Sequence, residues 1–349
     1  MSEVVIIDGA SGGGQVLRNA VALSAVTGRP IRVTNIRGSR PKPGLRPQHL
    51  TALRAAADLC QARLDGAEIS SGQIEFHPRD FPSGVTRRLD VGTAGSLTLV
   101  LQCLLPALAQ AATESQLTLV GGTDVPFSPP FDYFERVFLP ALRGMGVPVV
   151  SELVARGFYP RGGGQAKVQV RPARAVTPVA WLERGGVERI TGRSFSLGLP
   201  EHITRRMREA ACARLQKAGY GDLAIEVEVV ARGRSEGCGI ALEAECEGGA
   251  RLGGNALGRR GKRAEEVGEE AAEMLLAEIE PGAAVDSHLA DQLVVWMARA
   301  EGPSEFTTTR VTDHLRAAAK VTEAMAGVRF SFEEGKRVRV RCMPGASGG

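Results

Sequence analysis

The stretch VVIIDGASGGGQVLRNAVALSAV, residues 4–26, predicts a strand, a glycine loop and a helix in immediate succession. Residues 4–7 form an apolar run, and Leu17, Val21 and Ala25 recur at the spacing of one helix face. Gly12-Gly13-Gly14 lies between the two. A glycine cluster between a strand end and a helix start leaves backbone N–H groups free to bind an anion.

The glycine loop lies in a segment without acidic residues. No Asp or Glu occurs between Gly9 and Ala57, whereas eight basic residues do: Arg18, Arg29, Arg32, Arg37, Arg40, Lys42, Arg46 and Arg54. The net charge of the whole chain is +4, so the residues outside this segment sum to −4. A run of charge alone usually forms a solvated face. Glycines and arginines together favour phosphate or nucleic-acid binding.

The pattern that begins at residue 4 recurs, which predicts three β-α-β-α-β-β units. The first continues with a strand at 31–36, a helix from 47 and strands near 67–69 and 73–77. The second has a strand at 88–91, a helix at 96–110, a strand at 116–120, a helix at 131–145, and strands near 149–154 and 166–170. The third has helices at 288–299 and 313–326 and strands at 306–310, 328–332 and 337–341, with an unclear opening strand. Repetition of such units predicts sheets whose helices pack against one another.

An insertion separates the second unit from the third. Asp8 and Asp90 are 82 residues apart, whereas Asp90 and Asp286 are 196 apart. The extra residues have their own strand-helix-strand-helix order, which is typical of a small domain rather than a loop. We therefore expect an α/β (α+β) fold with a discontinuous large domain, residues 1–180 and 282–349, and a small inserted α/β domain, residues 181–281.

Composition limits the class of protein. The 349 residues are 43% hydrophobic and 23% charged, as in ordinary globular proteins. Aromatic residues make up 5%, which argues against a long row of base-stacking rings. Six scattered cysteines without a Cys-x-x-Cys pair indicate a reduced, cytoplasmic protein without structural zinc. The most apolar segment, residues 97–109, is too short to span a membrane, so we expect no membrane partner.

His314 is a candidate nucleophile at the start of the predicted helix 313–326. Thr312 or Asp313 is a suitable cap for that helix, and its N–H dipoles keep an imidazole neutral. Neutral imidazole attacks activated phosphorus, although most lone histidines at such positions are structural. His49 occupies the matching place in the first unit, and the symmetry of the sequence does not choose between the two.

Two further polar features could contact a nucleotide. Gln102 is a strongly polar side chain within an apolar helix, and its amide suits the edge of an adenine as well as an internal hydrogen bond. His288-Leu289-Ala290-Asp291-Gln292 opens the corresponding helix of the third unit, where a solvated helix start is the alternative.

Taken together, the chain resembles the RNA 3′-terminal phosphate cyclase family. The likeness covers essentially the whole chain and is weakest in the insertion. The matching motifs are Asp8-Gly9-Ala10, Gly12 to Arg18, Ile36-Arg37, Arg40 to Leu45, Gln48-His49-Leu50, Gly92-Thr93-Ala94-Gly95-Ser96, Gly121-Gly122-Thr123-Asp124, Gly157 to Gly164, and His288 to Gln292.

The resemblance implies a reaction in three steps. A histidine takes AMP from ATP, AMP passes to the 3′-phosphate of RNA, and the neighbouring 2′-OH then closes a 2′,3′-cyclic phosphate. It also implies ATP and a divalent metal, Mg²⁺ or Mn²⁺, as cofactors and RNA with a 3′-phosphate as partner. By motif position it implies His314 as nucleophile; Gln102, His288, Leu289, Ala290, Asp291 and Gln292 at the nucleotide; and Arg18, Arg37, Arg40 and Gln48 at the RNA phosphate.

The first loop departs from the family. Family members usually carry a glutamate there that helps to hold the metal, whereas residues 9–15 are shorter and have none. Loss of an oxygen ligand weakens Mg²⁺ or Mn²⁺ binding, so the metal ligands stay unknown: ATP phosphates, Asp8 or Asp291 are alternatives. Pro47 also stands where some members have a basic residue.

Two other functions compete with an active cyclase. The missing glutamate would suit a non-catalytic cyclase-like RNA-binding protein of RNA processing or ribosome assembly, although such relatives lack the nucleophilic histidine that His314 would supply. A transferase acting on a small anion, such as an enolpyruvyl transferase, is the third alternative, because those enzymes share a related repeated architecture.

Overall fold

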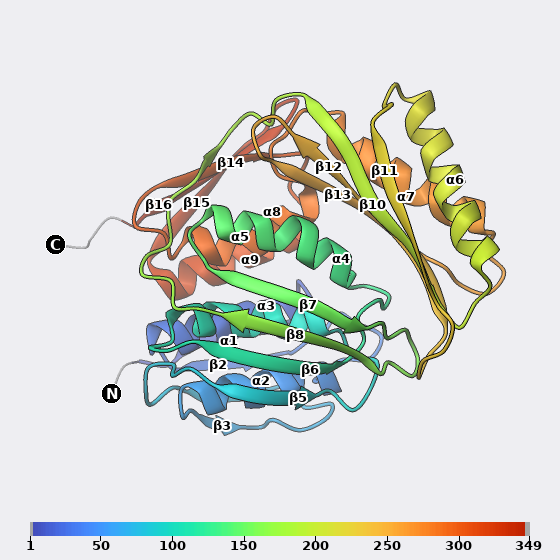
Figure 1. The fold of residues 1–349 in the computed structure, drawn as a ribbon. Coiled ribbons are helices and arrows are strands. Elements are labelled where there is room, and N and C mark those ends of the chain that lie inside the picture. The colour runs from blue at the N-terminus through green and yellow to red at the C-terminus, as the bar shows by residue number, and fades with distance from the viewer. Residues whose placement is uncertain (1–2, 346–349) are drawn as a thin grey trace.

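The computed structural model describes residues 3–345 and shows a mixed α/β fold of four-stranded sheets and helices (Figure 1). The predicted fold class is therefore confirmed. In the first sheet the strands are β1 (Val5–Asp8), β2 (Ile31–Thr34), β3 (Arg63–Asp65) and β4 (Ile74–His77), in the order β1-β2-β4-β3. Strands β1 and β2 are parallel, and the other pairs are antiparallel. Helices α1 (Gly14–Thr27) and α2 (Pro47–Leu59) belong to this part of the chain.

The second sheet repeats the same order as β5-β6-β8-β7. Its strands are β5 (Thr86–Asp90), β6 (Ser115–Gly121), β7 (Val149–Ala155) and β8 (Gly164–Val170). Its helices are α3 (Leu97–Gln110) and a helix in three parts: α4 (Phe131–Tyr133), the π-helical η1 (Phe134–Phe138) and α5 (Leu139–Gly144).

The third sheet, β15-β16-β14-β9, has the corresponding order once more. It contains β14 (Ser304–Thr308), β15 (Val328–Glu333), β16 (Val338–Pro344) and the two-residue β9 (Ala180–Trp181), with helices α8 (Ser287–Met297) and α9 (Asp313–Ala326). Strand β9 supplies the opening strand that the sequence left unclear, and it pairs in parallel with β14 through Trp181 and Phe306. Trp181, expected as the first residue of the insertion, therefore lies in the third sheet, and the domain boundaries themselves stay a prediction.

The fourth sheet is formed by the chain between β9 and α8. It has the order β11-β10-β12-β13, from β10 (Val187–Leu197), β11 (Leu223–Val230), β12 (Gly237–Cys246) and β13 (Arg251–Leu257). Helices α6 (Glu201–Lys217) and α7 (Ala264–Ile279) cover its outer face (Figure 1). These helices and the sheet bury a separate apolar cluster that includes Met207, Leu215 and Leu275.

The helices of the three repeats share the main hydrophobic core. Helix α1 packs against α2, α3 and α9, and α8 packs against α9. Side chains such as Leu17, Leu101 and Leu293 are fully buried there, and each contributes about 1.5–3 kcal/mol by removal from water. Glycine permits the closest approach: a Cβ added at Gly12 would lie 2.8 Å from the Cβ of Ala317 in α9. The core thus brings the starts of α1 and α9 together.

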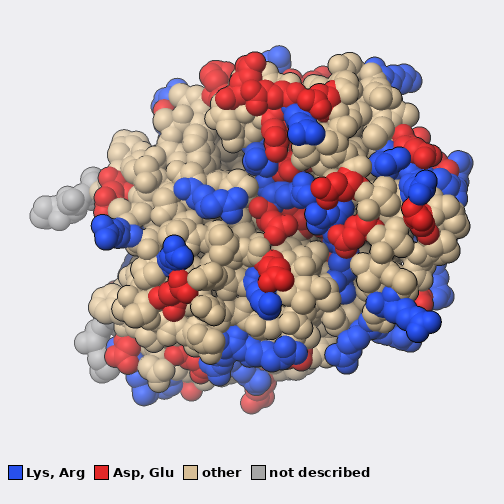
Figure 2. Space-filling model, viewed as in Figure 1, with Lys and Arg blue, Asp and Glu red and all other residues tan. Residues whose placement is uncertain are grey.

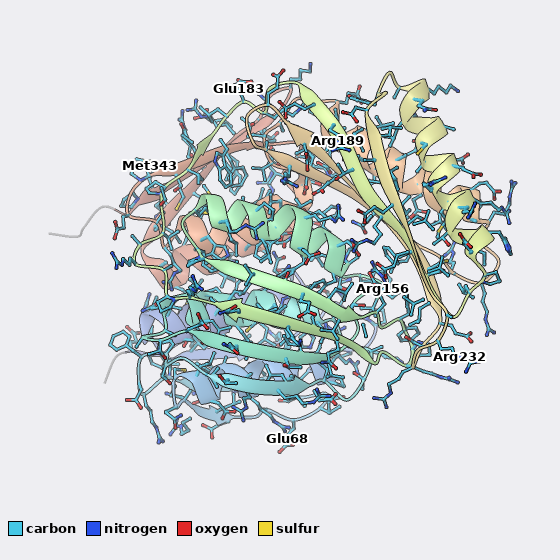
Figure 3. The ribbon with its side chains drawn as sticks, viewed as in Figure 1. Glu68, Arg156, Glu183, Arg189, Arg232 and Met343 are labelled. Atoms are coloured by element: carbon cyan, nitrogen blue, oxygen red, sulfur yellow. The ribbon has the colours of Figure 1, made fainter. Side chains whose placement is uncertain are left out.

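A buried ionic cluster joins the second and fourth sheets. The Arg156 guanidinium lies 2.8 Å from Asp132, 3.2 Å from Asp124 and 2.7 Å from Glu228 on β11, and it stacks 3.6 Å from the centre of the Phe195 ring. Figure 3 shows Arg156 between the end of β7 and the fourth sheet. A buried charge left without its partner is costly, so this cluster fixes the fourth sheet relative to the second. None of the described helices is long and apolar enough to cross a membrane.

Candidate active site

His314 lies in the first turn of α9 and is exposed to solvent. Thr312 caps this helix, because its hydroxyl oxygen accepts a hydrogen bond from the Leu315 N–H at 3.0 Å. The imidazole Nδ1 lies 2.6 Å from the amide oxygen of Gln15 in α1. The Gln15 side chain also lies beside the Asp291 carboxyl group. Because the Gln15 oxygen can only accept a hydrogen bond, the neutral His314 ring carries its proton on Nδ1 and an unshared electron pair on Nε2.

Charges around His314 keep its ring neutral. Desolvation lowers the pKa of His314 below its ordinary value of 6.5. The pKa is lowered further by the charges of Arg18 and Arg40 and by the nearby His288, whereas the carboxylate of Asp313 raises it. A neutral imidazole is the form that attacks phosphorus. His314 therefore has a lowered pKa and an Nδ1 that faces the Gln15 oxygen, which leaves the lone pair of a neutral ring on Nε2.

The glycine loop presents open N–H groups next to two arginines. Gly13 has φ 63° and precedes α1, and no side chain caps this helix. A Cβ added at Gly13 would lie 3.0 Å from Nη2 of Arg40, and one added at Gly14 would lie 3.1 Å from Nη1 of Arg18. Uncapped helix amides and guanidinium groups both bind phosphate oxygens. The structure therefore brings the predicted Arg18 and Arg40 to the loop and to His314.

Arg37 lies near Arg40 and Arg46, and its side chain binds the backbone of the loop at residues 42–44. Its Nη1 donates hydrogen bonds to the carbonyl oxygens of Lys42 at 2.8 Å and Gly44 at 3.0 Å. Partial burial lowers the pKa of Arg37, and the charges of Arg46 and Arg40 lower it further. The guanidinium keeps its Nε and Nη2 donors free of partners among residues 3–345.

Gln48 connects α2 to the start of α3. Its side-chain oxygen accepts a hydrogen bond from the Ser96 N–H at 2.9 Å, and a Cβ added at Gly95 would lie 2.9 Å from its Cβ. Gln48, a predicted phosphate ligand, thus connects the loop at residues 92–96 to the start of α2. Its amide N–H₂ has no hydrogen-bond partner within residues 3–345 and can donate to a ligand.

The predicted nucleotide residues come together from α3 and α8. Gln102 donates from Nε2 to the side-chain oxygen of Gln292 at 2.8 Å, and Gln292 donates to the carbonyl of His288 at 2.8 Å. Burial raises the pKa of Asp291 to about 7, although the charge of Arg18 opposes the shift. Leu289 and Ala290 are buried, and their N–H groups bond to the Asp286 side chain and carbonyl.

His49 has a different environment from His314. It is buried in α2, and its Nδ1 accepts a hydrogen bond from the Arg46 N–H at 3.1 Å. Burial lowers the pKa of His49 to about 3, with help from Arg18, Arg37 and Arg46. The lone pair of its Nδ1 accepts the Arg46 N–H, and its Nε2 lies against Gly14. The structure therefore favours His314 over His49 as the candidate nucleophile, a choice that the symmetry of the sequence left open.

Comparison with known proteins gives the family. The family model described as RNA 3′-terminal phosphate cyclase matches residues 10–332. A protein named RNA 3′-terminal phosphate cyclase from Pyrobaculum neutrophilum is 46% identical over 94% of this chain and 95% of its own length. A protein of the same name from Pyrobaculum aerophilum is 43% identical, and the match covers 95% of each chain. Another from Caldivirga maquilingensis is also 43% identical, and the match covers 98% of each chain.

The chain belongs to the RNA 3′-terminal phosphate cyclase family, a family of enzymes. The motif positions that the resemblance assigned can therefore be followed in the structure. Gln15, Arg18, Arg40 and His288 are among those that lie close to His314.

The cyclase-family residues around His314 do not build a metal cage. Asp8 accepts hydrogen bonds from the Ala10 N–H at 3.0 Å and from Asn35 at 3.1 Å. Asp291 interacts with Arg18 and Gln15 instead. A metal held by several protein carboxylates does not fit this arrangement.

In residues 3–345, three potential metal ligands gather elsewhere, on β3 and β4: Asp65, Glu75 and His77. Arg63 lies 3.1 Å from Asp65, and Arg32 lies 2.7 Å from Glu75. These arginines already neutralise both carboxylates, so the cluster carries no metal assignment.

Sequence reasoning did not single out Gln15 as a site residue. It lies one residue after the glycine cluster and appeared there only as part of a motif. Its role depends on contacts with α8 and α9, some 300 residues away in the chain. No local pattern in the sequence signals such a contact.

Proposed function

We propose that this protein converts the 3′-terminal phosphate of RNA to a 2′,3′-cyclic phosphate, using ATP and a covalent histidine–AMP intermediate. The observation that carries the proposal is the unprotonated Nε2 of His314 beside the uncapped glycine loop, Arg18 and Arg40. The names of the relatives support it for the reaction class.

In the first step the Nε2 of His314 attacks the α-phosphorus of ATP. A P–N bond forms, and the bond to the departing pyrophosphate breaks. The imidazole becomes cationic, and the Gln15 oxygen stabilises that charge because it accepts the Nδ1–H hydrogen bond. Gln102, Gln292 and His288 are proposed to bind the nucleotide, together with the neighbouring positions 289–291.

In the second step an oxygen of the RNA 3′-phosphate attacks the phosphorus of the histidine–AMP, and the P–N bond breaks. Arg18, Arg37 and Arg40, with Gln48, are proposed to hold this phosphate. Paired guanidinium groups suit a phosphate dianion because each donates two parallel hydrogen bonds.

In the third step the 2′-oxygen attacks the activated 3′-phosphorus, and its proton passes to solvent. A P–O bond to the 2′-oxygen forms, the bond to AMP breaks, and AMP leaves. The phosphate monoester becomes a good electrophile only after adenylylation, and the hydroxyl is already adjacent. Such positioning replaces an encounter between two molecules by an intramolecular step.

Mg²⁺ or Mn²⁺ is proposed to enter with the ATP phosphates, since the carboxylate set around His314 does not fit a protein-held ion. No step is assigned to it. We propose the cytoplasm as the location, in keeping with six cysteines that form no disulfide.

The test uses an oligoribonucleotide with a labelled 3′-phosphate, ATP and added metal. A cyclase converts the phosphatase-sensitive end to a phosphatase-resistant one and releases AMP and pyrophosphate, whereas His314→Ala does neither. RNA binding that is indifferent to ATP and to the 3′-phosphate, with no conversion, would establish the non-catalytic alternative instead.

A further inference from the structure

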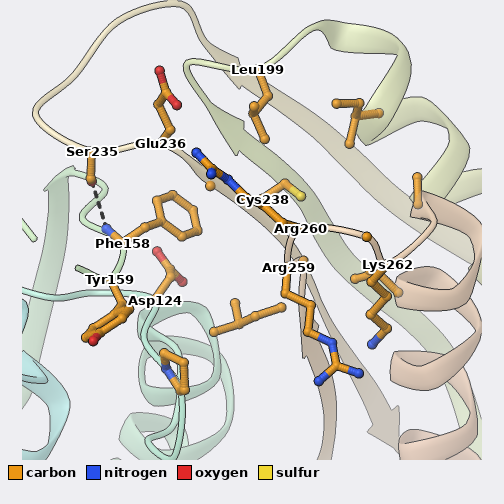
Figure 4. A pocket seen from close by; sticks show the side chains of 18 of the residues that line it. Asp124, Phe158, Tyr159, Leu199, Ser235, Glu236, Cys238, Arg259, Arg260 and Lys262 are labelled. Atoms are coloured by element: carbon orange, nitrogen blue, oxygen red, sulfur yellow. Dashed lines mark hydrogen bonds between the residues drawn. The ribbon is translucent and has the colours of Figure 1, made fainter. Parts of the chain in front are cut away.

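A cavity of about 1070 Å³ opens between the second and fourth sheets (Figure 4). One wall is the β7–β8 loop with Phe158, Tyr159 and Arg161, and the opposite wall is the β13–α7 segment with Arg259 and Arg260. Pockets for a single drug-sized ligand usually measure roughly 300–1,000 Å³. The volume is therefore large enough for a chain of several small units.

Unpaired positive charge distinguishes this cavity. Arg206 and Lys262 also line it, but they form ion pairs with Glu265 and Glu270. Arg161, Arg259 and Arg260, in contrast, have no carboxylate within salt-bridge distance in residues 3–345. Glu236 is an acidic residue on the same lining. On the face of the molecule that Figure 2 shows, Lys and Arg side chains are interspersed with Asp and Glu.

An exposed aromatic side chain lines the same cavity as these charges. Tyr159 is 68% exposed although its neighbour Phe158 is buried. Figure 4 shows the Tyr159 ring at the mouth of the cavity, across from Arg259. An exposed ring and unpaired arginines in one cavity are a combination that binds single-stranded nucleic acid, because bases stack on the ring while the guanidinium groups contact the phosphates.

The floor of the cavity offers a buried acceptor. Asp124 has one carboxylate oxygen bonded to Thr123 at 2.7 Å and to Arg156 at 3.2 Å, while its Oδ1 has no partner within residues 3–345. Buried polar atoms nearly always have partners. A ligand with a hydroxyl or amino donor would supply one.

Close loop contacts connect the cavity to the candidate active site. A Cβ added at Gly163 would lie 2.6 Å from the Cβ of Arg234, and one added at Gly162 would lie 2.8 Å from the Cα of Ala94. The residue after Ala94 is Gly95, and a Cβ added there would lie 2.9 Å from the Cβ of Gln48. Direct packing of these loops therefore links Gln48 to the wall of the cavity.

We propose that this cavity binds the nucleotides of the RNA strand that precede its 3′-terminal phosphate. The inference rests on the proposed function. Unpaired arginines hold the phosphates, Tyr159 stacks on a base, and the fourth sheet thus supplies the RNA-binding wall opposite the catalytic repeats.

The test compares cyclisation of 3′-phosphorylated RNAs of two and ten nucleotides. Wild-type protein is expected to favour the longer RNA in kcat/KM. The Arg259→Ala/Arg260→Ala protein should lose about tenfold or more on the ten-nucleotide RNA and keep the two-nucleotide activity and self-adenylylation. Arg205→Ala/Arg214→Ala is the matched control, since it removes two arginines that lie outside the cavity and pair with Glu201 and Glu273.

A second readout does not require catalysis. Binding of a ten-nucleotide RNA with a 3′-OH end, measured by fluorescence anisotropy, should weaken about tenfold in the cavity variant, and the slope against log salt should fall by about two. Tyr159→Ala should weaken binding with little change in that slope. Equal losses on both RNA lengths, or unchanged binding of the longer RNA, would overturn the inference. Absence of adenylylation in wild-type protein would overturn the proposed function alone.

Discussion

The starts of α2 and α9 occupy the same place in two repeats, and each carries a histidine. His49 is buried, accepts the Arg46 N–H on Nδ1 and has a pKa lowered to about 3. His314 is exposed and meets the Gln15 oxygen with Nδ1, which leaves Nε2 unprotonated. The difference lies in the partner of Nδ1: a backbone donor makes the His49 ring a helix cap, whereas an amide acceptor leaves the His314 ring with the free Nε2 that the proposed nucleophile requires.

Replacing the two histidines in turn should have the largest effect. His314→Ala removes the attacking atom, so adenylylation should fall by roughly four or more orders of magnitude. His49→Ala removes a cap and leaves a cavity, so the free energy of unfolding should fall by about 1–3 kcal/mol while adenylylation per folded molecule stays within about threefold. Labelling from [α-³²P]ATP and urea unfolding measure the two quantities. The comparison fails if both variants lose labelling equally.

Arg40 should act on the phosphate and not on the fold. Because it is exposed and lies beside Gly13, Arg40→Ala should lower the cyclisation rate about 100-fold, as removal of one preorganised donor does. Arg40→Lys should recover only part of this, because an ammonium cannot donate two parallel bonds. Single-turnover cyclisation gives the rates, and an unchanged melting temperature is the control. Full activity of Arg40→Ala would remove this residue from the site.

Gln15 is expected to be a positioning residue. Gln15→Leu removes the acceptor of the Nδ1–H and should lower adenylylation about tenfold. Gln15→Glu keeps an acceptor but places a negative charge beside the ring, which raises the pKa of His314. The acidic limb of its pH–rate profile should therefore move to higher pH. A purely structural role would lower the rate without moving that limb.

The pH dependence of the wild-type protein should be the smallest effect. The pKa of His314 is lowered by burial and by the charges of Arg18 and Arg40, so the neutral form persists to lower pH than for an ordinary imidazole, and adenylylation should decline only at a correspondingly lower pH. Asp291, with a pKa of about 7, titrates near neutral pH. Asp291→Asn serves as the control, because a decline near pH 7 that disappears in this variant belongs to Asp291. A decline near pH 7 that persists in Asp291→Asn would contradict the lowered pKa.

Much of the fold could be predicted because its signals are local. The apolar run at residues 4–7, the stripe of the helix that follows and their recurrence mark the repeats without reference to contacts. Strand β9 escaped prediction because two residues, Ala180 and Trp181, are too few to show an alternating pattern. It takes its place in the sheet by pairing with β14, across the whole insertion.

The site could be predicted only in part. Its residue types were visible, since a histidine at a helix start and arginines around glycines suggest phosphate chemistry from local sequence alone. The symmetry of the repeats did not choose between His49 and His314, and only the resemblance to the family pointed to His314. The contact that separates the two histidines, between Gln15 of α1 and His314 of α9, has no signal in the local sequence. The same holds for Arg156, whose partners come from three separate segments.

The most direct measurement is the position of AMP on the protein after reaction with ATP. Protein is incubated with ATP and metal, digested at alkaline pH, and its peptides are mapped by mass spectrometry. The predicted result is AMP on the peptide that contains His314 and none on the peptide that contains His49, with the His314 adduct absent in His314→Ala. AMP on His49, or no adduct on either peptide, would contradict the assignment of His314 as the nucleophile.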